Sequence, residues 1–112
     1  MVAMLAAVVA ATTLTIAVSP GNGGATRHAT LTCGPAGGTL PRAASACTKL
    51  AALNAPFAPV PPNTMCTQIF GGPQVAHVKG TFRGRTVKAT FNRRGGCEIA
   101  RWNRVSFLFV TH

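Results

Sequence analysis

Acidic residues are almost absent from this sequence. Among its 112 residues, 11 are Lys or Arg, a single one is acidic, Glu98, and Asp does not occur. Paired carboxylates for general acid and base catalysis, a Ser-His-Asp relay and carboxylate metal sites all need acids that this composition does not supply. The sequence therefore predicts a protein that is not an enzyme.

Metal-ligand patterns are lacking as well. The three histidines, His28, His77 and His112, lie far apart without ligand spacing, and a surface or hydrogen-bonded role explains each of them better than a metal site does. The four cysteines are separated by 13, 18 and 30 residues, which fits no zinc-ligand spacing. We expect neither a metal nor another cofactor.

Hydrophobic runs are short. The apolar run at residues 2–9 is too short to span a bilayer, so we expect no membrane partner. Small residues follow it, as at the cleavage site of a secretory signal, although no Lys or Arg precedes Arg27. We interpret residues 1–11 as the remnant of a truncated signal peptide, with strand and tail as the alternative. Residues 12–112 would then be one secreted, extracellular domain.

Cysteine is present in an even number, in a chain long enough for one domain with one modest core. Two disulfide bridges among Cys33, Cys47, Cys66 and Cys97 are the expected framework. Three pairings are possible, and the spacing alone does not choose among them. A sequential pairing would close loops of roughly 14 and 31 residues, worth about 3 and 3.5 kcal/mol in the chain-entropy description.

Alternating apolar residues predict antiparallel strands. In residues 13–19, Leu14, Ile16 and Val18 alternate with smaller or polar side chains, as in a half-buried strand. Further strands are expected at residues 29–33, 75–82, 85–91 and 104–110, with a hairpin turn at Arg83-Gly84.

A helix is expected at residues 41–54. Pro41 suits a first helical turn, and the residues after it place one apolar stripe on the helix, formed by Ala43, Cys47, Leu50 and Leu53. The predicted fold is therefore α+β, with a five-stranded antiparallel sheet, one or two short helices packed on one face, and two disulfides.

The stretch "PPNTMCTQIFGGP", residues 61–73, carries no charge in a very basic chain. Four prolines in residues 55–62 stiffen the approach to it, and a disulfide at Cys66 would hold its middle. One interpretation is a rigid, exposed recognition loop. The alternative is an ordinary surface turn whose apolar side chains fold inward.

Several separated segments resemble the Streptomyces subtilisin inhibitor family, which comprises small secreted protease inhibitors of actinobacteria. They are "TLTC" at residues 30–33, "GPAGGTLPRAASACTKLAAL" at residues 34–53, "MC" at residues 65–66, "GTFRGRTV" at residues 80–87 and "CEIARWNRVSFLF" at residues 97–109. The order of these segments and the positions of all four cysteines are similar to the family over nearly the whole chain after Thr12.

The resemblance implies bridges from Cys33 to Cys47 and from Cys66 to Cys97, and a homodimer formed through the sheet. It also implies a subtilisin-like serine protease as partner and a reactive bond between Gln68 and Ile69, two residues after the third cysteine. The residues that would contact the protease around this bond are Met65, Cys66, Thr67, Phe70 and Gly71.

Stiffness gives such a loop a physical purpose. A protease binds its substrate as an extended strand, and a flexible peptide loses about 1 to 2 kcal/mol of backbone entropy for each residue that is fixed. A loop that is rigid before the encounter avoids that loss. After cleavage, the Cys66 bridge would keep the new chain ends together, so that religation competes with release.

Three departures from the family pattern affect this expectation. Family members usually have Met or Lys at the position of Gln68, so we expect poor inhibition of trypsin, which prefers a cation. Pro73 lies one residue farther from the bond than in the family, which predicts a looser leaving side. Gly95 and Gly96 stand where the family has a bracing Asn, and this predicts a loop that is braced less well.

The positive charge supports a second hypothesis. A basic patch could bind nucleic acid or an anionic cell wall without inhibitory activity. Its members would be Arg83, Arg85, Lys88, Arg93, Arg94, Arg101 and Arg104, near Phe82 and Trp102. Because no helix-turn-helix or stacking-aromatic motif is present, we expect no nucleic-acid partner, a solvated basic face, and Trp102 in the core or an interface. An exposed Gln68 could also serve as a transglutaminase amine acceptor, which only its exposure would support.

Overall fold

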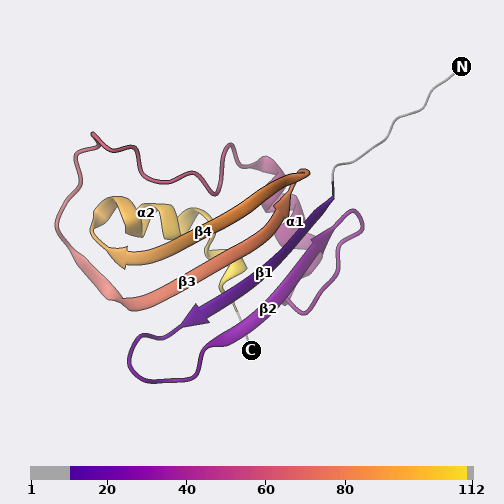
Figure 1. Cartoon of the computed structure of the whole chain (residues 1–112), viewed down its shortest axis with the longest axis horizontal. Coiled ribbons are helices and arrows are strands. Elements are labelled where there is room, and N and C mark those ends of the chain that lie inside the picture. Colours follow the sequence, from indigo (N-terminus) through magenta and orange to yellow (C-terminus); the bar gives the residue numbers. More distant parts are fainter. Residues whose placement is uncertain (1–10, 111–112) are drawn as a thin grey trace, which may run out of the picture.

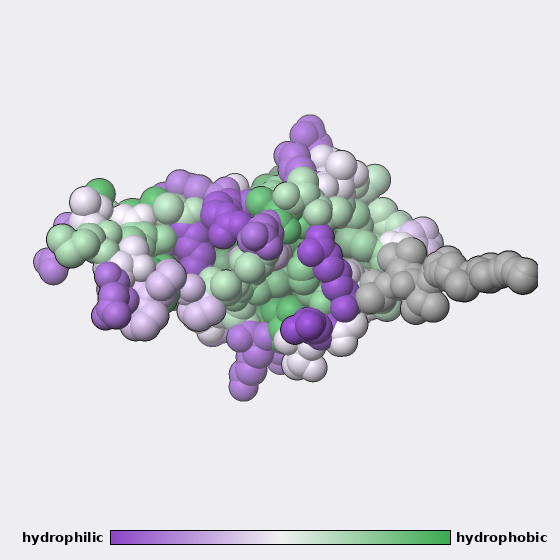
Figure 2. All heavy atoms as spheres, turned by 90° about the horizontal axis from the view of Figure 1, so that it is seen from above, coloured by the Kyte–Doolittle hydropathy of each residue, from purple (hydrophilic) through white to green (hydrophobic). Residues whose placement is uncertain are grey.

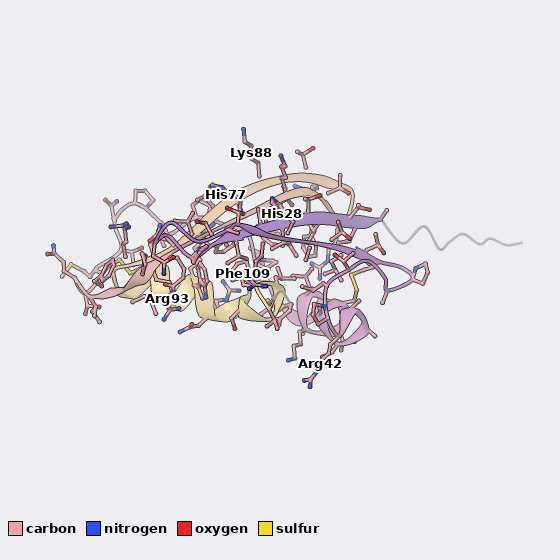
Figure 3. The ribbon with its side chains drawn as sticks, turned by 90° about the horizontal axis from the view of Figure 1, so that it is seen from below. His28, Arg42, His77, Lys88, Arg93 and Phe109 are labelled. Atoms are coloured by element: carbon pink, nitrogen blue, oxygen red, sulfur yellow. A yellow bond between two sulfur atoms is a disulfide. The ribbon has the colours of Figure 1, made fainter. Side chains whose placement is uncertain are left out.

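The computed structural model describes residues 11–110, so that His112 and nearly all of the predicted signal remnant lie outside the described residues. A four-stranded antiparallel sheet in the order β2-β1-β3-β4 carries two helices on one of its faces (Figures 1 and 3). The elements are β1 (Thr12–Ser19), β2 (Arg27–Cys33), α1 (Ala43–Ala52), β3 (Phe70–Phe82), β4 (Arg85–Arg94), α2 (Gly96–Arg104) and a short 3-10 helix, η2 (Ser106–Leu108). The predicted α+β class is therefore confirmed.

The predicted alternation of β1 places the core on one face of the sheet. Leu14 and Ile16 are fully buried, whereas Thr13 and Thr15 between them are exposed on the opposite face. In the neighbouring strands, Leu31 lies opposite Leu14 and Val78 lies opposite Ile16. This register aligns the apolar rows of the central strands beneath the helices.

The expected hairpin at Arg83-Gly84 joins β3 to β4. Both turn residues have positive φ angles, 52° and 79°, which is the backbone of the two-residue turns that match the twist of antiparallel strands. Phe82 and Arg85 flank the turn as a pair in the ladder. The hairpin prediction is confirmed.

The predicted fifth strand at residues 104–110 is wrong. This segment finishes α2 and then forms η2, in which Val105 and Leu108, three residues apart, are both fully buried. Phe109 packs against the rings of Phe91 and Trp102, with centroids 5.4 and 4.5 Å away. The alternating apolar residues thus fill the core under the sheet instead of extending it.

The helix predicted at residues 41–54 is confirmed over Ala43–Ala52. Ala46 and Leu50 are buried, and Cys47 forms a disulfide with Cys33 across a Cα–Cα distance of 5.7 Å. This bridge fixes α1 to the end of β2.

Candidate functional site

The long connection between α1 and β3, residues 53–69, contains no helix or strand. Every residue from 61 to 70 is exposed, and among them the exposed fractions of Met65, Ile69 and Phe70 are 95%, 55% and 64%. Across the described part of the chain, only Val110 is a further large hydrophobic residue with comparable exposure. Figure 2 shows pale and green surface, from weakly polar and apolar residues, interspersed with purple hydrophilic residues at the left end of the view where this loop projects. The interpretation of an inward-folded turn is therefore wrong.

The loop itself carries no charged side chain. No Lys, Arg, Asp or Glu occurs between Lys49 and Lys79, and this interval includes the whole loop. Contiguous exposed apolar surface rimmed by polar residues is typical of interaction sites, and Met65, Ile69 and Phe70 are exposed within six residues of one another. The loop is thus an uncharged, partly apolar projection from a basic domain.

The entry to the loop is fixed to the body of the domain. The Pro56 side chain is fully buried, and the Phe57 ring packs edge-on against Phe82 with centroids 5.3 Å apart. The Arg101 guanidinium donates hydrogen bonds to the carbonyl oxygens of Ala58, at 2.8 Å, and Phe57, at 3.4 Å. It also bonds the carbonyl oxygen of Thr90 on β4 at 2.6 Å, so one side chain joins the loop to the sheet.

A disulfide holds the loop near its exposed centre. Cys66 is bonded to Cys97 in the first turn of α2, with a Cα–Cα distance of 5.3 Å. The two observed bridges are the pairing that the family resemblance implied among the three possibilities. Gln68 lies two residues after this covalent anchor.

Main-chain hydrogen bonds brace the loop on both sides of Gln68. The Gly96 N–H donates to the carbonyl oxygen of Thr67 at 2.8 Å, and the Gly95 N–H donates to the carbonyl oxygen of Ile69 at 2.6 Å. These donors belong to the N-terminus of α2, where backbone N–H groups have no partner within the helix. No side chain braces the loop from Gly95 or Gly96, but their two backbone donors bond the loop on both sides of Gln68.

Glycine is required at one of these two positions by the space available. A Cβ atom at Gly96 would collide with the Thr67 side-chain oxygen. At Gly95 the φ angle is 96°, a conformation that other residues rarely adopt. The pair thus allows α2 to approach the loop closely enough for its backbone to bond.

The exit from the loop is held by β4. Phe70 pairs with Arg94, and the Arg94 guanidinium lies 5.6 Å from the Phe70 ring centroid. Register is irregular between Phe70 and Val75, so β3 begins with a bulge. The Arg93 Nε donates to the carbonyl oxygen of Gly71 at 3.0 Å.

Most arginines of the predicted basic patch stabilise the fold through hydrogen bonds. Hydrogen bonds to main-chain carbonyl oxygens are donated by the guanidinium groups of Arg83, Arg93, Arg101 and Arg104. Trp102 is only 8% exposed and packs against Phe109, so it is a core residue as predicted. Lys79 and Lys88 pair on the outer face of the sheet, away from the loop.

Two further observations concern the described residues only. No three His, Cys, Asp or Glu side chains among them gather as metal ligands, and His77 instead bonds Thr90 Oγ1 at 3.2 Å. None of their helices combines the length and apolar character needed to cross a membrane.

Sequence reasoning located Cys66, Gln68 and the loop but missed the groups that hold it. The main-chain donors of Gly95 and Gly96 leave no signal, since every residue except proline has an N–H group. Arg93 and Arg101 were assigned to a surface patch, although each bonds a carbonyl far away in the sequence. The one usable sign of a closely packed helix start was the Gly-Gly pair, in which Gly95 precedes the amphipathic nine-residue helix and Gly96 is its first residue.

Comparison with known proteins identifies the family and a similar solved structure. The family model described as "Subtilisin inhibitor-like" matches residues 10–93. No curated protein matches the sequence. Among solved structures, the chain is similar to Streptomyces caespitosus sermetstatin, which was determined in complex with Bacillus licheniformis subtilisin. The two chains are 26% identical with a TM-score of 0.53, and the match covers 85% of this chain and 96% of sermetstatin.

The matched region contains three of the four cysteines, the exposed loop, β1 to β3 and all of β4 except Arg94, and thus most of the described fold. Proteins of this family are inhibitors and not enzymes. The chain belongs to the subtilisin inhibitor-like family of serine protease inhibitors.

Proposed function

We propose that the chain inhibits subtilisin-like serine proteases by presenting the Gln68–Ile69 bond in a substrate-like loop. Gln68 would enter the primary specificity pocket of the protease. Met65, Cys66 and Thr67 would bind on the acyl side of the bond, and Ile69, Phe70 and Gly71 on the leaving side.

The bracing of Gln68 from both sides carries this proposal. The carbonyl oxygens of Thr67 and Ile69 are fixed by α2, and Cys66 is fixed by its bridge, whereas the side chains of this segment remain exposed. The Gln68 carbonyl oxygen makes no hydrogen bond with any described residue. A segment that is rigid in its backbone and free in its side chains avoids most of the ordering entropy of binding.

The chemistry of the loop supports an apolar or neutral specificity pocket in the partner. Gln68 has no charge, and the exposed neighbours Met65, Ile69 and Phe70 offer apolar contact area. The subtilisin that accompanies sermetstatin in its crystal structure is a protease of the proposed class. Gln68 would offer no cation to the specificity pocket of trypsin, so trypsin would bind poorly.

Secretion and dimerisation belong to the same proposal. Two disulfides are typical of proteins from oxidising, extracellular surroundings. The homodimer would use the outer face of the sheet, where exposed Thr13 and Thr15 lie beside Thr32, Thr81 and Thr30 in register. Sedimentation of the oxidised chain tests the dimer, and a single monomer mass at micromolar concentration would contradict it.

The proposal is tested by titrating a fixed amount of subtilisin with the oxidised chain and following residual activity. We expect nearly stoichiometric loss of subtilisin activity and little loss of trypsin activity. Gln68→Pro is the control, because it distorts only the exposed bond and should keep the fold while abolishing inhibition. Full subtilisin activity at a tenfold excess of the folded chain would overturn the proposal.

A further inference from the structure

We infer that Arg93, which lies outside the loop, is a positioning residue that retains the leaving side after cleavage and so favours religation. The inference rests on the proposed function and extends it to the state in which the Gln68–Ile69 bond is broken. The guanidinium group of Arg93 would hold the segment that follows the cleaved bond, which contains no disulfide near the new end.

The Arg93 side chain connects the start of β3 to α2. Its Nε donates to the carbonyl oxygen of Gly71 at 3.0 Å, and its Nη1 donates to Asn103 Oδ1 at 3.3 Å. The guanidinium carbon lies 5.6 Å from the centroid of the Trp102 ring, within the range of a cation–π contact. Figure 3 shows Arg93 on the side of the sheet that carries the helices, opposite Lys88.

Cleavage leaves the two new ends held unequally. Hydrolysis adds one water across the Gln68–Ile69 amide, giving a carboxylate on Gln68 and an ammonium group on Ile69, and religation expels the same water. The acyl end stays near the site through the Cys66 bridge and the bond from the Gly96 N–H to the Thr67 carbonyl. The amine end has no covalent anchor of this kind.

The leaving side is also the more flexible one by composition. Gly71 and Gly72 follow Phe70 directly, and glycine gains more conformational freedom on release than any other residue. The Ile69 carbonyl accepts a hydrogen bond from the Gly95 N–H and Phe70 pairs with Arg94, but regular pairing with β4 resumes only at Val75. The Arg93 bond falls on Gly71, between these contacts and the regular part of the ladder, where it limits the motion of the freed end.

The geometry also explains the choice of arginine. A planar guanidinium can bond a carbonyl, bond an amide and lie over an aromatic ring at once, whereas a lysine ammonium is a single point of charge. Arg93 makes all three contacts. A lysine at this position would keep the charge but could make only some of these three contacts.

The test measures the equilibrium ratio of cleaved to intact chain. A catalytic amount of subtilisin is incubated with intact chain and, separately, with chain already cut at Gln68–Ile69, until chromatography gives one ratio from both directions. Fixing one residue's backbone corresponds to about a factor of ten in an equilibrium constant. We therefore expect the ratio to rise about tenfold in Arg93→Met and by less in Arg93→Lys.

Arg104→Met is the matched control. Arg104 also donates to a main-chain carbonyl, that of Asn54 just after α1, at 2.9 Å, but this bond is remote from the cleaved one. The control loses the same charge and a similar hydrogen bond, so its ratio should equal that of the wild type. Thermal unfolding of both variants shows whether their stabilities fall alike, and a purely structural role would move stability without moving the ratio.

Three results would overturn the inference. A ratio within twofold of the wild type in folded Arg93→Met is the first, and an equal rise in Arg104→Met is the second. If Arg93→Met does not fold, a wild-type ratio in folded Arg93→Lys is the third. A wild-type chain that is neither inhibitory nor cut at Gln68–Ile69 removes the proposed function and this inference together, which separates it from the other outcomes.

Discussion

Replacing Gly96 by alanine should weaken inhibition while leaving the domain folded. The added Cβ would collide with the side-chain oxygen of Thr67, and the nearby Thr67 Cβ is in tight but tolerable contact. Thr67 is β-branched and therefore stiff, so the loop has to move away from α2. This movement breaks the hydrogen bond from the Gly96 N–H to the Thr67 carbonyl.

The size of the effect follows from two losses. One hydrogen bond contributes about 1 kcal/mol, and freeing about one residue of the loop adds an ordering cost of about 1 to 2 kcal/mol on binding. The sum, about 2 to 3 kcal/mol, corresponds to an inhibition constant roughly 30-fold to 150-fold higher. Alanine is a better helix former than glycine, so the free energy of unfolding should change little at this first helical position.

The assay is a subtilisin inhibition titration of four chains: wild type, Gly96→Ala, Thr67→Ala and the double variant. Thr67→Ala removes the oxygen that causes the collision, so the double variant should inhibit better than Gly96→Ala alone. This coupling is the signature of a steric contact between the two residues. Equal inhibition constants for wild type and folded Gly96→Ala, or no rescue in the double variant, would refute the reasoning.

The two bridges should separate stability from inhibition. Replacing Cys66 and Cys97 by serine should lower the free energy of unfolding by about 3.5 kcal/mol and weaken subtilisin inhibition in the folded fraction. Replacing Cys33 and Cys47 by serine should lower the free energy of unfolding by about 3 kcal/mol and leave inhibition unchanged. Urea denaturation measures the stabilities, and titration of subtilisin measures the inhibition. Gln68→Lys should strengthen trypsin inhibition by at least about 30-fold, because the added cation suits its pocket, and an unchanged trypsin constant would contradict the assigned bond. Arg101→Met should lower the free energy of unfolding by about 2 to 4 kcal/mol, since three carbonyl oxygens lose a donor, and a urea midpoint equal to that of the wild type would contradict this.

The regular part of the fold was predictable because its signals are local. The alternation of Leu14 and Ile16 with threonines identifies a strand with one buried face, and the Arg83-Gly84 pair identifies a hairpin turn. The apolar stripe that includes Leu50 identifies α1 in the same way. Each of these patterns is complete within a dozen residues, so a reader of the sequence needs no tertiary information.

The structure of residues 104–110 was predicted wrongly because their apolar residues fit both the spacing of a strand and the spacing of a 3-10 helix. Val105, Phe107 and Phe109 alternate like a strand, yet Val105 and Leu108 are the residues that a 3-10 turn buries. The helix before them was missed because charged residues surround Trp102 and because the apolar face spans only nine residues. Packing against Phe91 decides between these patterns, and that contact is not visible in sequence.

The candidate site also has a part that was predictable from the sequence and a part that was not. The resemblance to the inhibitor family predicts the reactive bond two residues after the third cysteine, Cys66, and this sequence separation identifies Gln68. The brace could not be read, because its donors are backbone N–H groups that become available only where α2 begins. The missing Asn predicted a loop that is braced less well, and that prediction did not include the two backbone hydrogen bonds that the close approach of α2 permits.

The position of the cleaved bond tests the central claim most directly. The chain would be incubated with substoichiometric subtilisin, recovered after denaturation, and its fragments identified by mass and by N-terminal sequencing. We predict a single slow cut that yields a new N-terminus at Ile69, with the fragments joined by the Cys66–Cys97 bridge until reduction. Rapid cutting at several sites, or a first cut elsewhere in residues 53–74, would contradict the account.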